Sequence, residues 1–228
     1  CFQEFYKEKT NRFNTLDTLL EFQKAIYYHE EYTYINRQTY FFGIITFSRW
    51  PIINKGVFHF PGSDNICIFS DMVIHGDTLR IYNCHLESIR FDHKDYAFLD
   101  SIELKLDEKR IEGARSIFKR LKYAYIKRAA QADTLAGHIR NCPFPVILCG
   151  DFNDTPISYS YHMISRDLED SFKEAGSGLG VTYAGKFPSF RIDYVLHSKE
   201  FEAISMDIIS KNYSDHYPVT VELIKRDQ

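Results

Sequence analysis

The sequence predicts an α/β protein in which two mainly antiparallel sheets pack face to face, with helices on the outside. Apolar, strand-like runs outnumber helical patterns along the 228 residues, and many of them are joined by short turns. One such turn, His75-Gly76-Asp77-Thr78, separates two β-type runs and predicts an antiparallel hairpin. The stretch from Asp107 to Asn141 has apolar residues spaced by three or four, which predicts the main helix.

The remaining elements follow from local patterns. A first helix is expected within residues 11–27, with Asn14 or Thr15 as its cap. Thr155-Pro156 predicts the start of a short helix. Residues 92–109 are expected to form a loop or helical excursion. With no repeat or linker, residues 1–228 are expected to form a single domain. Strands are expected at 32–35, 40–47, 66–74, 79–86, 145–150, 191–197, 201–209 and 217–224.

The composition indicates a globular chain that is 44% hydrophobic and 16% aromatic, with a net charge of −3. This charge gives no bulk positive field, so binding to nucleic acid is not favoured. Cys67, Cys84 and Cys149 lie in apolar runs, which favours packed, reduced thiols. The sequence contains no run of 18 apolar residues, so no membrane span is predicted within this chain. A monomer is expected, and the composition does not indicate a compartment.

Two motifs suggest a hydrolytic centre. The apolar run from Val146 ends in Gly150, which would let the backbone turn, and is followed by Asp151 and Asn153. In layered α/β proteins, strand ends of this kind collect polar chemistry. A second acid–imidazole pair, Asp215-His216, stands just before another apolar strand. An Asx turn at 151–153 and a surface histidine at 216 are the structural alternatives.

Three further segments offer chemistry of lower specificity. Asp193 stands within an otherwise apolar strand and either pairs with Arg191 or supports a catalytic histidine. His85, at the end of the hairpin's second strand, can act as a metal ligand, a phosphate donor or a core histidine. Glu4, at a strand end, is a candidate Mg²⁺ ligand, since Mg²⁺ binds hard oxygens.

Taken together, these motifs resemble those of the endonuclease/exonuclease/phosphatase superfamily, the DNase I-like fold. The match extends from Glu4 to His216, and six motifs in order are highly specific. They are Phe2-Gln3-Glu4, Gly43 through Ser48 to Pro51, His85-Leu86, Gly150-Asp151-Phe152-Asn153, Arg191-Ile192-Asp193-Tyr194 and Ser214-Asp215-His216.

The resemblance implies a four-layer α/β sandwich and Mg²⁺- or Mn²⁺-dependent cleavage of a phosphate ester. It implies that Asp151 and Asn153 orient the attacking water and hold the phosphate, and that His85 stabilises phosphoryl oxygens or the leaving group. Asp193 and His216 would form the acid–imidazole pair. Glu4 would be the metal carboxylate, with Asp215 beside the metal.

The sequence departs from the family in one respect. The family's first strand carries an asparagine at the metal and phosphate site, and no residue here can supply it. We therefore expect the sequence to be a fragment of a bacterial member that lacks the first strand, with weak Mg²⁺ binding and low activity. Some bacterial relatives carry membrane helices ahead of this domain, so the full-length protein is a candidate for membrane anchoring.

Two other functions stay open. A DNA-repair-type nuclease would use the basic residues of the main helix, although acidic residues are interleaved among them and indicate an ordinary solvated face. A catalytically inactive binding or scaffold domain is the alternative from another class, and the retention of both histidines and all the acids argues against it. The substrate, whether nucleic acid, phospholipid, inositol phosphate or small phosphodiester, is not indicated by the sequence. The basic residues are Lys105, Lys109, Arg110, Arg115, Lys119, Arg120, Lys122, Lys127 and Arg128.

Overall fold

The computed structural model describes residues 1–9, 14–89, 91, 108–185 and 190–226. Its first unit is a three-stranded antiparallel sheet of order β1-β3-β2, made of β1 (Phe2–Glu8), β2 (Tyr27–Asn36) and β3 (Tyr40–Ser48). Helix α1 (Thr15–Gln23) packs on this sheet through Leu16, which meets Phe5 and Ile45 in a small core. The side chain of Asn14 caps the helix by accepting a hydrogen bond from the Asp17 amide.

The second unit is a six-stranded sheet of order β4-β5-β6-β7-β9-β8. All of its pairs are antiparallel except β6 with β7. Because β6 and β7 run parallel, their carboxyl ends lie side by side, and a long crossover must join them. The strands are β4 (Ile52–His59), β5 (Ile66–Ile74), β6 (Asp77–His85), β7 (Val146–Asp151), β8 (Glu169–Asp170) and β9 (Asp193–His197).

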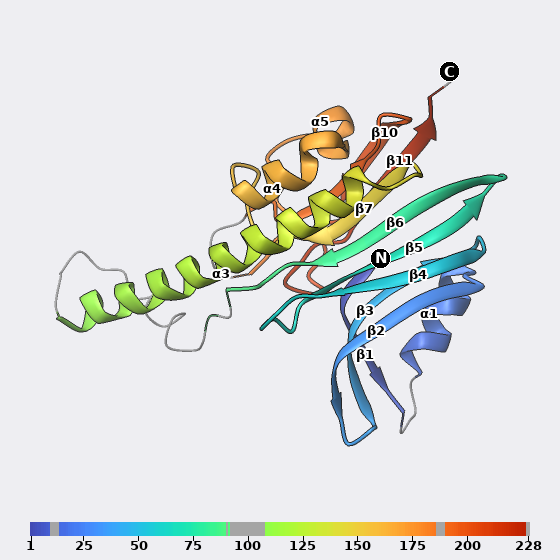
Figure 1. The fold of residues 1–228 in the computed structure, drawn as a ribbon. Helices are drawn as coiled ribbons and strands as arrows, with labels where there is room; N and C mark the ends of the chain where they lie inside the picture. The colour runs from blue at the N-terminus through green and yellow to red at the C-terminus, as the bar shows by residue number, and fades with distance from the viewer. Residues whose placement is uncertain (10–13, 90, 92–107, 186–189, 227–228) are drawn as a thin grey trace.

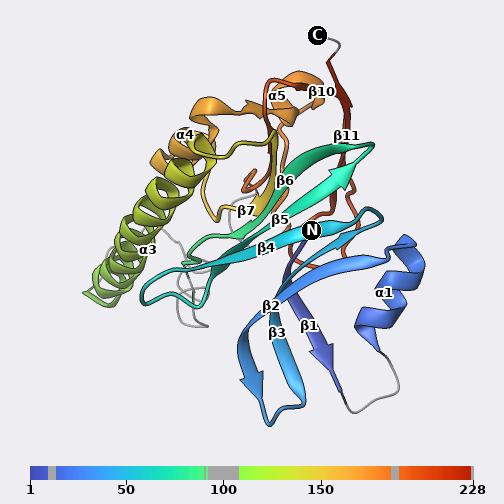
Figure 2. The ribbon, with the colours of Figure 1, turned by 45° about the vertical axis from the view of Figure 1, so that its right-hand side comes forward.

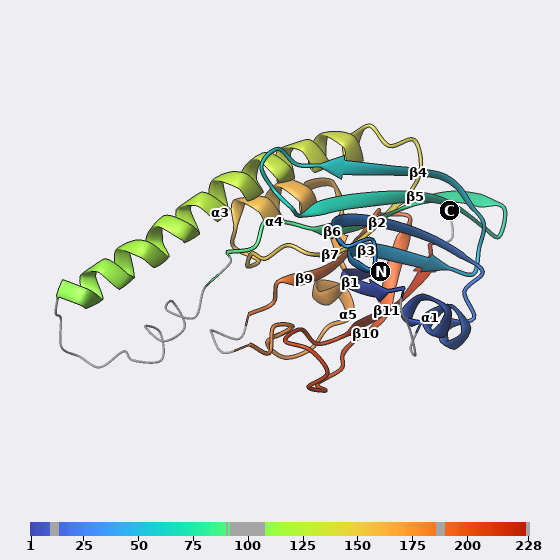
Figure 3. The same cartoon turned by 90° about the horizontal axis from the view of Figure 1, so that it is seen from below.

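Helix α3 (Glu108–Arg140) lies in that crossover and covers one face of the six-stranded sheet together with α4 (Tyr159–Ile164), as Figures 1 and 3 show. The largest core lies beneath them, where Leu135 and Ile164 meet Tyr82 and Leu148. The chain continues through a 3₁₀ turn (Ser165–Asp167) and α5 (Ser171–Ala175). A two-stranded antiparallel sheet, β10 (Phe201–Ile208) and β11 (Val219–Lys225), completes the fold.

The two larger sheets face each other, with α1 outside one and α3 and α4 outside the other (Figure 2). Ile44 from the smaller sheet packs against Ile66 and Ile68 of the larger one. The predicted four-layer α/β sandwich is therefore confirmed. Among the described residues, no helix is both long and apolar enough to cross a membrane.

Two local expectations were wrong, and one strand was not predicted. Strand β4 was not predicted, because Gly56 interrupts its pattern; a Cβ there would stand only 2.2 Å from the Phe69 ring. The short helix after β7 begins at Tyr159, capped by Ser158, and not at Thr155. Cys67 and Cys84 are not free thiols, because they oppose each other on β5 and β6 and form a disulfide. The stretch at 92–109, predicted as a loop or helical excursion, lies almost wholly outside the described residues.

Buried polar side chains also bridge the two larger sheets. His29 on β2, which is 3% exposed, has its Nδ1 2.9 Å from the hydroxyl of Ser70 on β5. The fully buried Asn83 on β6 donates its amide to the carbonyl of Ile45 at 2.8 Å and accepts from the amide of Gln3 at 2.5 Å. These bonds fix how one sheet is placed on the other, because a slip would leave buried polar groups without partners.

His29 should make folding stability depend on pH. Burial, and then the nearby charge of Lys55, lowers its pKa to about 4, below the value of about 6.5 in unfolded chains. The unfolded state therefore binds the extra proton first, so the stabilising contribution is complete above about pH 6.5 and is lost as the pH falls towards 4. In His29→Gln, which carries no titrating group, the melting temperature should fall less between pH 7 and pH 5 than in the wild type. Equal slopes in thermal unfolding would contradict this assignment.

Candidate active site

The site forms where β6 and β7 end. Their parallel register places His85 opposite Asp151, and His85 Nε2 lies 3.6 Å from Asp151 Oδ2. Gly150 permits this approach: a Cβ at that position would meet the Cys84 carbonyl oxygen at 2.5 Å. The glycine thus serves close strand packing and not the turn that the sequence suggested, since β7 continues through Asp151.

Asp151 is 6% exposed and is held by the residues that follow it. The backbone N–H of Asn153 donates to Asp151 Oδ1 at 2.7 Å, and its side-chain amide donates to Oδ2 at 3.0 Å and to the Leu86 carbonyl at 3.1 Å. Asn153 has a φ of 51°, in the left-handed region that asparagine tolerates better than most residues. The Asx-type turn expected as a structural alternative is present, and it also orients the carboxylate.

Asp193 and His216 lie together as expected for an oriented imidazole. His216 Nδ1 donates to Asp193 Oδ2 at 2.9 Å, and Nε2, on the other side of the ring, lies 3.9 Å from Asp151 Oδ2. The alternative pairing of Asp193 with Arg191 is wrong. Arg191 is buried and donates instead to Asp170, at 2.8 and 3.0 Å.

Sequence reasoning missed the segment that supports this pair. The buried hydroxyl of Thr182 accepts from the backbone N–H groups of Ile192 and Asp193, at 3.0 and 3.1 Å. The ring of Tyr183 lies edge-on to His216, with centroids 5.2 Å apart, and the two residues form an antiparallel bridge. No periodicity or charge pattern in the sequence marks Thr182, because its role lies in contacts with residues ten and more positions away.

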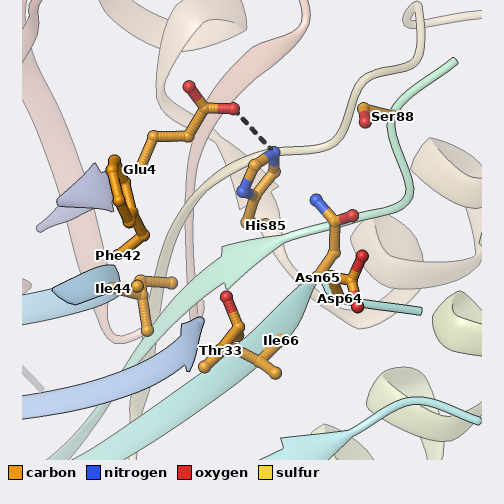
Figure 4. A pocket seen from close by; sticks show the side chains of 10 residues that line it. Glu4, Thr33, Phe42, Ile44, Asp64, Asn65, Ile66, His85 and Ser88 are labelled. Carbon is orange, nitrogen blue, oxygen red and sulfur yellow. Dashed lines mark ion pairs between the residues drawn. The ribbon is translucent and has the colours of Figure 1, made fainter. Parts of the chain in front are cut away.

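Glu4 reaches the site from the other sheet. A bulge in the β1–β3 pairing between Phe2 and Phe5 contains this residue, whose φ is 52°. Bulges re-aim side chains beside active sites, and a non-glycine residue with positive φ is held there by its surroundings. The Glu4 side chain is 79% exposed, and its Oε1 lies 3.9 Å from His85 Nε2 (Figure 4).

These side chains border a single cavity of about 530 Å³. Asp193 stands behind His216, and the other six predicted site residues line the cavity wall. Apolar and aromatic residues complete its lining, among them Ile117, Leu121 and Tyr125 of α3. The six lining residues are Glu4, His85, Asp151, Asn153, Asp215 and His216.

The electrostatics of the cluster follow from burial and from its crowded acids. Burial raises the pKa of the Asp151 carboxyl, and the charge of Asp193 raises it further, while His216 opposes the shift. For His216, burial alone would lower the pKa, but the hydrogen bond to Asp193 and the charges of Asp193 and Asp151 outweigh it and raise the pKa. Excess negative charge in a partly buried cluster of this kind is what a bound cation neutralises.

Arg128 holds the loops of the site in place. It is fully buried, and its guanidinium donates to Asp154 Oδ2 at 3.0 Å and to the Glu87 carbonyl at 2.8 Å. It thus joins the loops after β6 and β7 to α3. This corrects the interpretation of the basic run as a wholly solvated face, since Arg128 is part of the interior.

The donor set fits a hard divalent cation. Glu4 and Asp215 offer carboxylate oxygens to the cavity, and Asp151, Asp193 and His216 bring potential ligand atoms within 4.8 Å of one another. A second group of this kind, Glu169, Glu174 and His197, fits less well. Both of its carboxylates already bond the positively charged guanidinium of Arg226 at 3.0 Å, which takes the place a cation would fill.

The fold and this cluster define a layered α/β protein with an acid–imidazole site between two sheets. The profile of the Endonuclease/Exonuclease/phosphatase family matches residues 1–216, and the chain belongs to that family. Membership places it among hydrolases that act on phosphate esters. A comparison with curated protein sequences finds no match.

Several solved structures share the fold. A mannosyl-6-phosphatase of Bacteroides thetaiotaomicron is 20% identical, with a TM-score of 0.61 over 92% of this chain and 80% of that one. The catalytic domain of human Nocturnin is 16% identical, with a TM-score of 0.63 over 94% of this chain and 77% of that one. A humanized TDP2 of D. rerio is 15% identical, with a TM-score of 0.62 over 92% of this chain and 81% of that one. At these identities the likeness shows the fold alone.

The packing of Gly150 can be tested by adding one methyl group. Gly150→Ala should destabilise the fold by about 1–3 kcal/mol, because β7 must move away from β6. The movement should also shift Asp151 from His85 and lower phosphate-ester hydrolysis. Gly137→Ala is the matched control: nothing lies within 4 Å of its added Cβ, and alanine favours the helix by up to about 1 kcal/mol. Urea unfolding would measure both, and equal stabilities of the two variants would contradict the packing argument.

Proposed function

We propose that the protein hydrolyses a phosphate ester in the presence of Mg²⁺ or Mn²⁺, through in-line attack of a water molecule on phosphorus. The observation that supports this most directly is the alignment of Asp193, His216 and Asp151, with contacts of 2.9 and 3.9 Å along the row. A structural salt bridge would not require a second acid at the far nitrogen of the imidazole.

Glu4 and Asp215 are the proposed holders of the cation, because both carry hard oxygens at the cavity wall. When bound, the metal would supply polarisation of a phosphoryl oxygen and neutralisation of developing charge. The bulge at Glu4 leaves its carboxylate open to the cavity, and the neighbouring His85 keeps it on the side of Asp151.

Asp151 is the proposed group that orients the water and accepts its proton. A carboxyl with a raised pKa holds a proton more readily than an ordinary aspartate, which suits a general base near neutral pH. The amide nitrogen of Asn153 already donates to Asp151 and to Leu86, so we assign Asn153 mainly to positioning Asp151. Direct donation to the phosphate would require one of these bonds to be exchanged.

The two histidines lie close to the same carboxylate oxygen of Asp151. Their Nε2 atoms lie 3.6 Å (His85) and 3.9 Å (His216) from Asp151 Oδ2. A protonated His216, favoured by its raised pKa, would stabilise the charged oxygens of the phosphoryl group or protonate the leaving group. Asp193 keeps Nδ1 of that ring occupied and thereby directs Nε2 into the cavity.

A nuclease is the second candidate, and one feature of α3 favours it. Residues 113–132 contain six Lys or Arg and no acid. Two of the six are used internally, however, since Arg128 binds Asp154 and Lys127 lies 3.5 Å from Glu87. With the net charge of −3, this argues for a smaller substrate than duplex DNA.

Asp151→Asn should reduce hydrolysis by about a thousandfold or more, because the amide keeps the shape but cannot accept the proton or complement the metal. Steady-state assays with Mg²⁺ on a panel of phosphomonoesters and phosphodiesters would measure it. Asp207→Asn, an exposed change on β10, is the control for the loss of one carboxylate. If Asp151→Asn turned over substrate near the wild-type rate, Asp151 would be only a turn residue. The proposed mechanism would then be wrong.

Asp193→Asn should lower kcat by about 10²–10⁴-fold while changing KM little, because the imidazole loses its anionic partner and its orientation. A purely structural role would instead lower the melting temperature and affect kcat in proportion to the unfolded fraction. Parallel thermal unfolding and kinetics separate the two outcomes.

A further inference from the structure

A second lobe of the cavity lies on the far side of Glu4 and His85. It has a volume of about 360 Å³ and opens between the two larger sheets, bordered by residues of β2, β3 and β5 (Figure 4). Glu4, His85 and Ser88 line both this lobe and the larger cavity, so a molecule reacting at Asp151 could extend into it. The volume is at the lower end of small-molecule pockets, which suits a group about one ring in size.

Asn65 is a polar group that the fold leaves available in this lobe. The residue is 6% exposed, and among the described residues its one hydrogen bond runs from its backbone N–H to the Ser63 hydroxyl at 3.1 Å. Its side-chain amide has no hydrogen-bond partner among the described residues, and Figure 4 shows it directed into the lobe beside His85. The amide atoms are not among the buried side-chain atoms that lack a partner, so they are open to the lobe and can donate to and accept from a molecule there.

The rest of the lining narrows the chemistry of that ligand. Phe42, 41% exposed, supplies an aromatic surface, and Thr33 and Ser88 supply hydroxyls. Glu4 and Asp64 add carboxylates, and no lysine or arginine stands among the described lining residues. The hydroxyls of a neutral group would find acceptors and donors here, and its C–H face would pack on Phe42.

We propose that this lobe binds the neutral, polyhydroxylated part of a phosphomonoester, a sugar or similar polyol, through Asn65, Phe42 and Thr33. The assignment rests on the proposed function, because it places the phosphate of the same substrate beside Asp151. A polynucleotide fits poorly, since its next phosphate would enter a lobe whose described lining contains no lysine or arginine to bind it.

The test compares two esters, a hexose 6-phosphate and phenyl phosphate, in the presence of Mg²⁺. Phe42→Leu and Asn65→Leu should each lower the ratio of kcat/KM for the sugar ester to that for the phenyl ester, on the order of tenfold for a lost buried contact. Tyr34→Leu is the matched control, because Tyr34 is an exposed neighbour of Phe42, with ring centroids 6.0 Å apart, that does not line the lobe. Thermal unfolding would verify that each variant is folded.

The outcomes separate the lobe from the chemistry. An unchanged ratio in both variants overturns the polyol assignment and leaves the hydrolase intact. The same holds if the wild type prefers a dinucleotide to the hexose 6-phosphate and both variants weaken that preference. If the wild type hydrolyses no ester, the proposed function fails. Titration calorimetry with hexose 6-phosphate then tests separately whether the lobe binds a sugar. Binding that Asn65→Leu and Phe42→Leu abolish supports the assignment, and the absence of binding to the wild type overturns it.

Discussion

The buried amide of Asn83 is the contact on which the geometry of the site depends. It bonds Ile45 and Gln3 across the gap between the two larger sheets, at 2.8 and 2.5 Å. Gln3 directly precedes Glu4, and Asn83 lies two residues before His85. One fully satisfied polar group therefore sets the register between the sheet that supplies Glu4 and the sheet that supplies the histidine and Asp151. Apolar packing such as that of Ile44 on Ile66 would stabilise several registers almost equally well.

A second set of buried polar contacts keeps the strand-end loops rigid. Arg128 fixes the loops after β6 and β7, and the Thr182 hydroxyl fixes the backbone of Asp193. Neither Arg128 nor Thr182 lines the cavity itself, but each holds a residue that does, Asp154 and Ile192 respectively. Preorganisation of this kind matters for catalysis, because reacting groups that must first be ordered lose much of the advantage of proximity.

Much of the fold and the site followed from short-range signals. The apolar run ending in Asp151, the hairpin at 75–78 and the helix at 107–141 each have a local pattern that hydrophobic burial imposes, and the structure contains all three. The pairing of Asp193 with His216 could be expected only through the order of the motifs. Asn83, Arg128 and Thr182 could not be expected, because each is defined by partners distant in sequence. The disulfide was missed for the same reason, since strand register, which places Cys67 opposite Cys84, cannot be read from either strand alone.

The two-lobed shape of the cavity has a consequence for how such proteins diverge. The acids and histidines stand on strand ends and in the tight turns that follow them, whereas the lobe walls come from the α3 helix, from the β2–β3 hairpin and from the chain just before β5. Substitutions in the walls can therefore exchange one bound group for another while the strand ends stay untouched. A change of substrate then requires no change in the acids and histidines of the site.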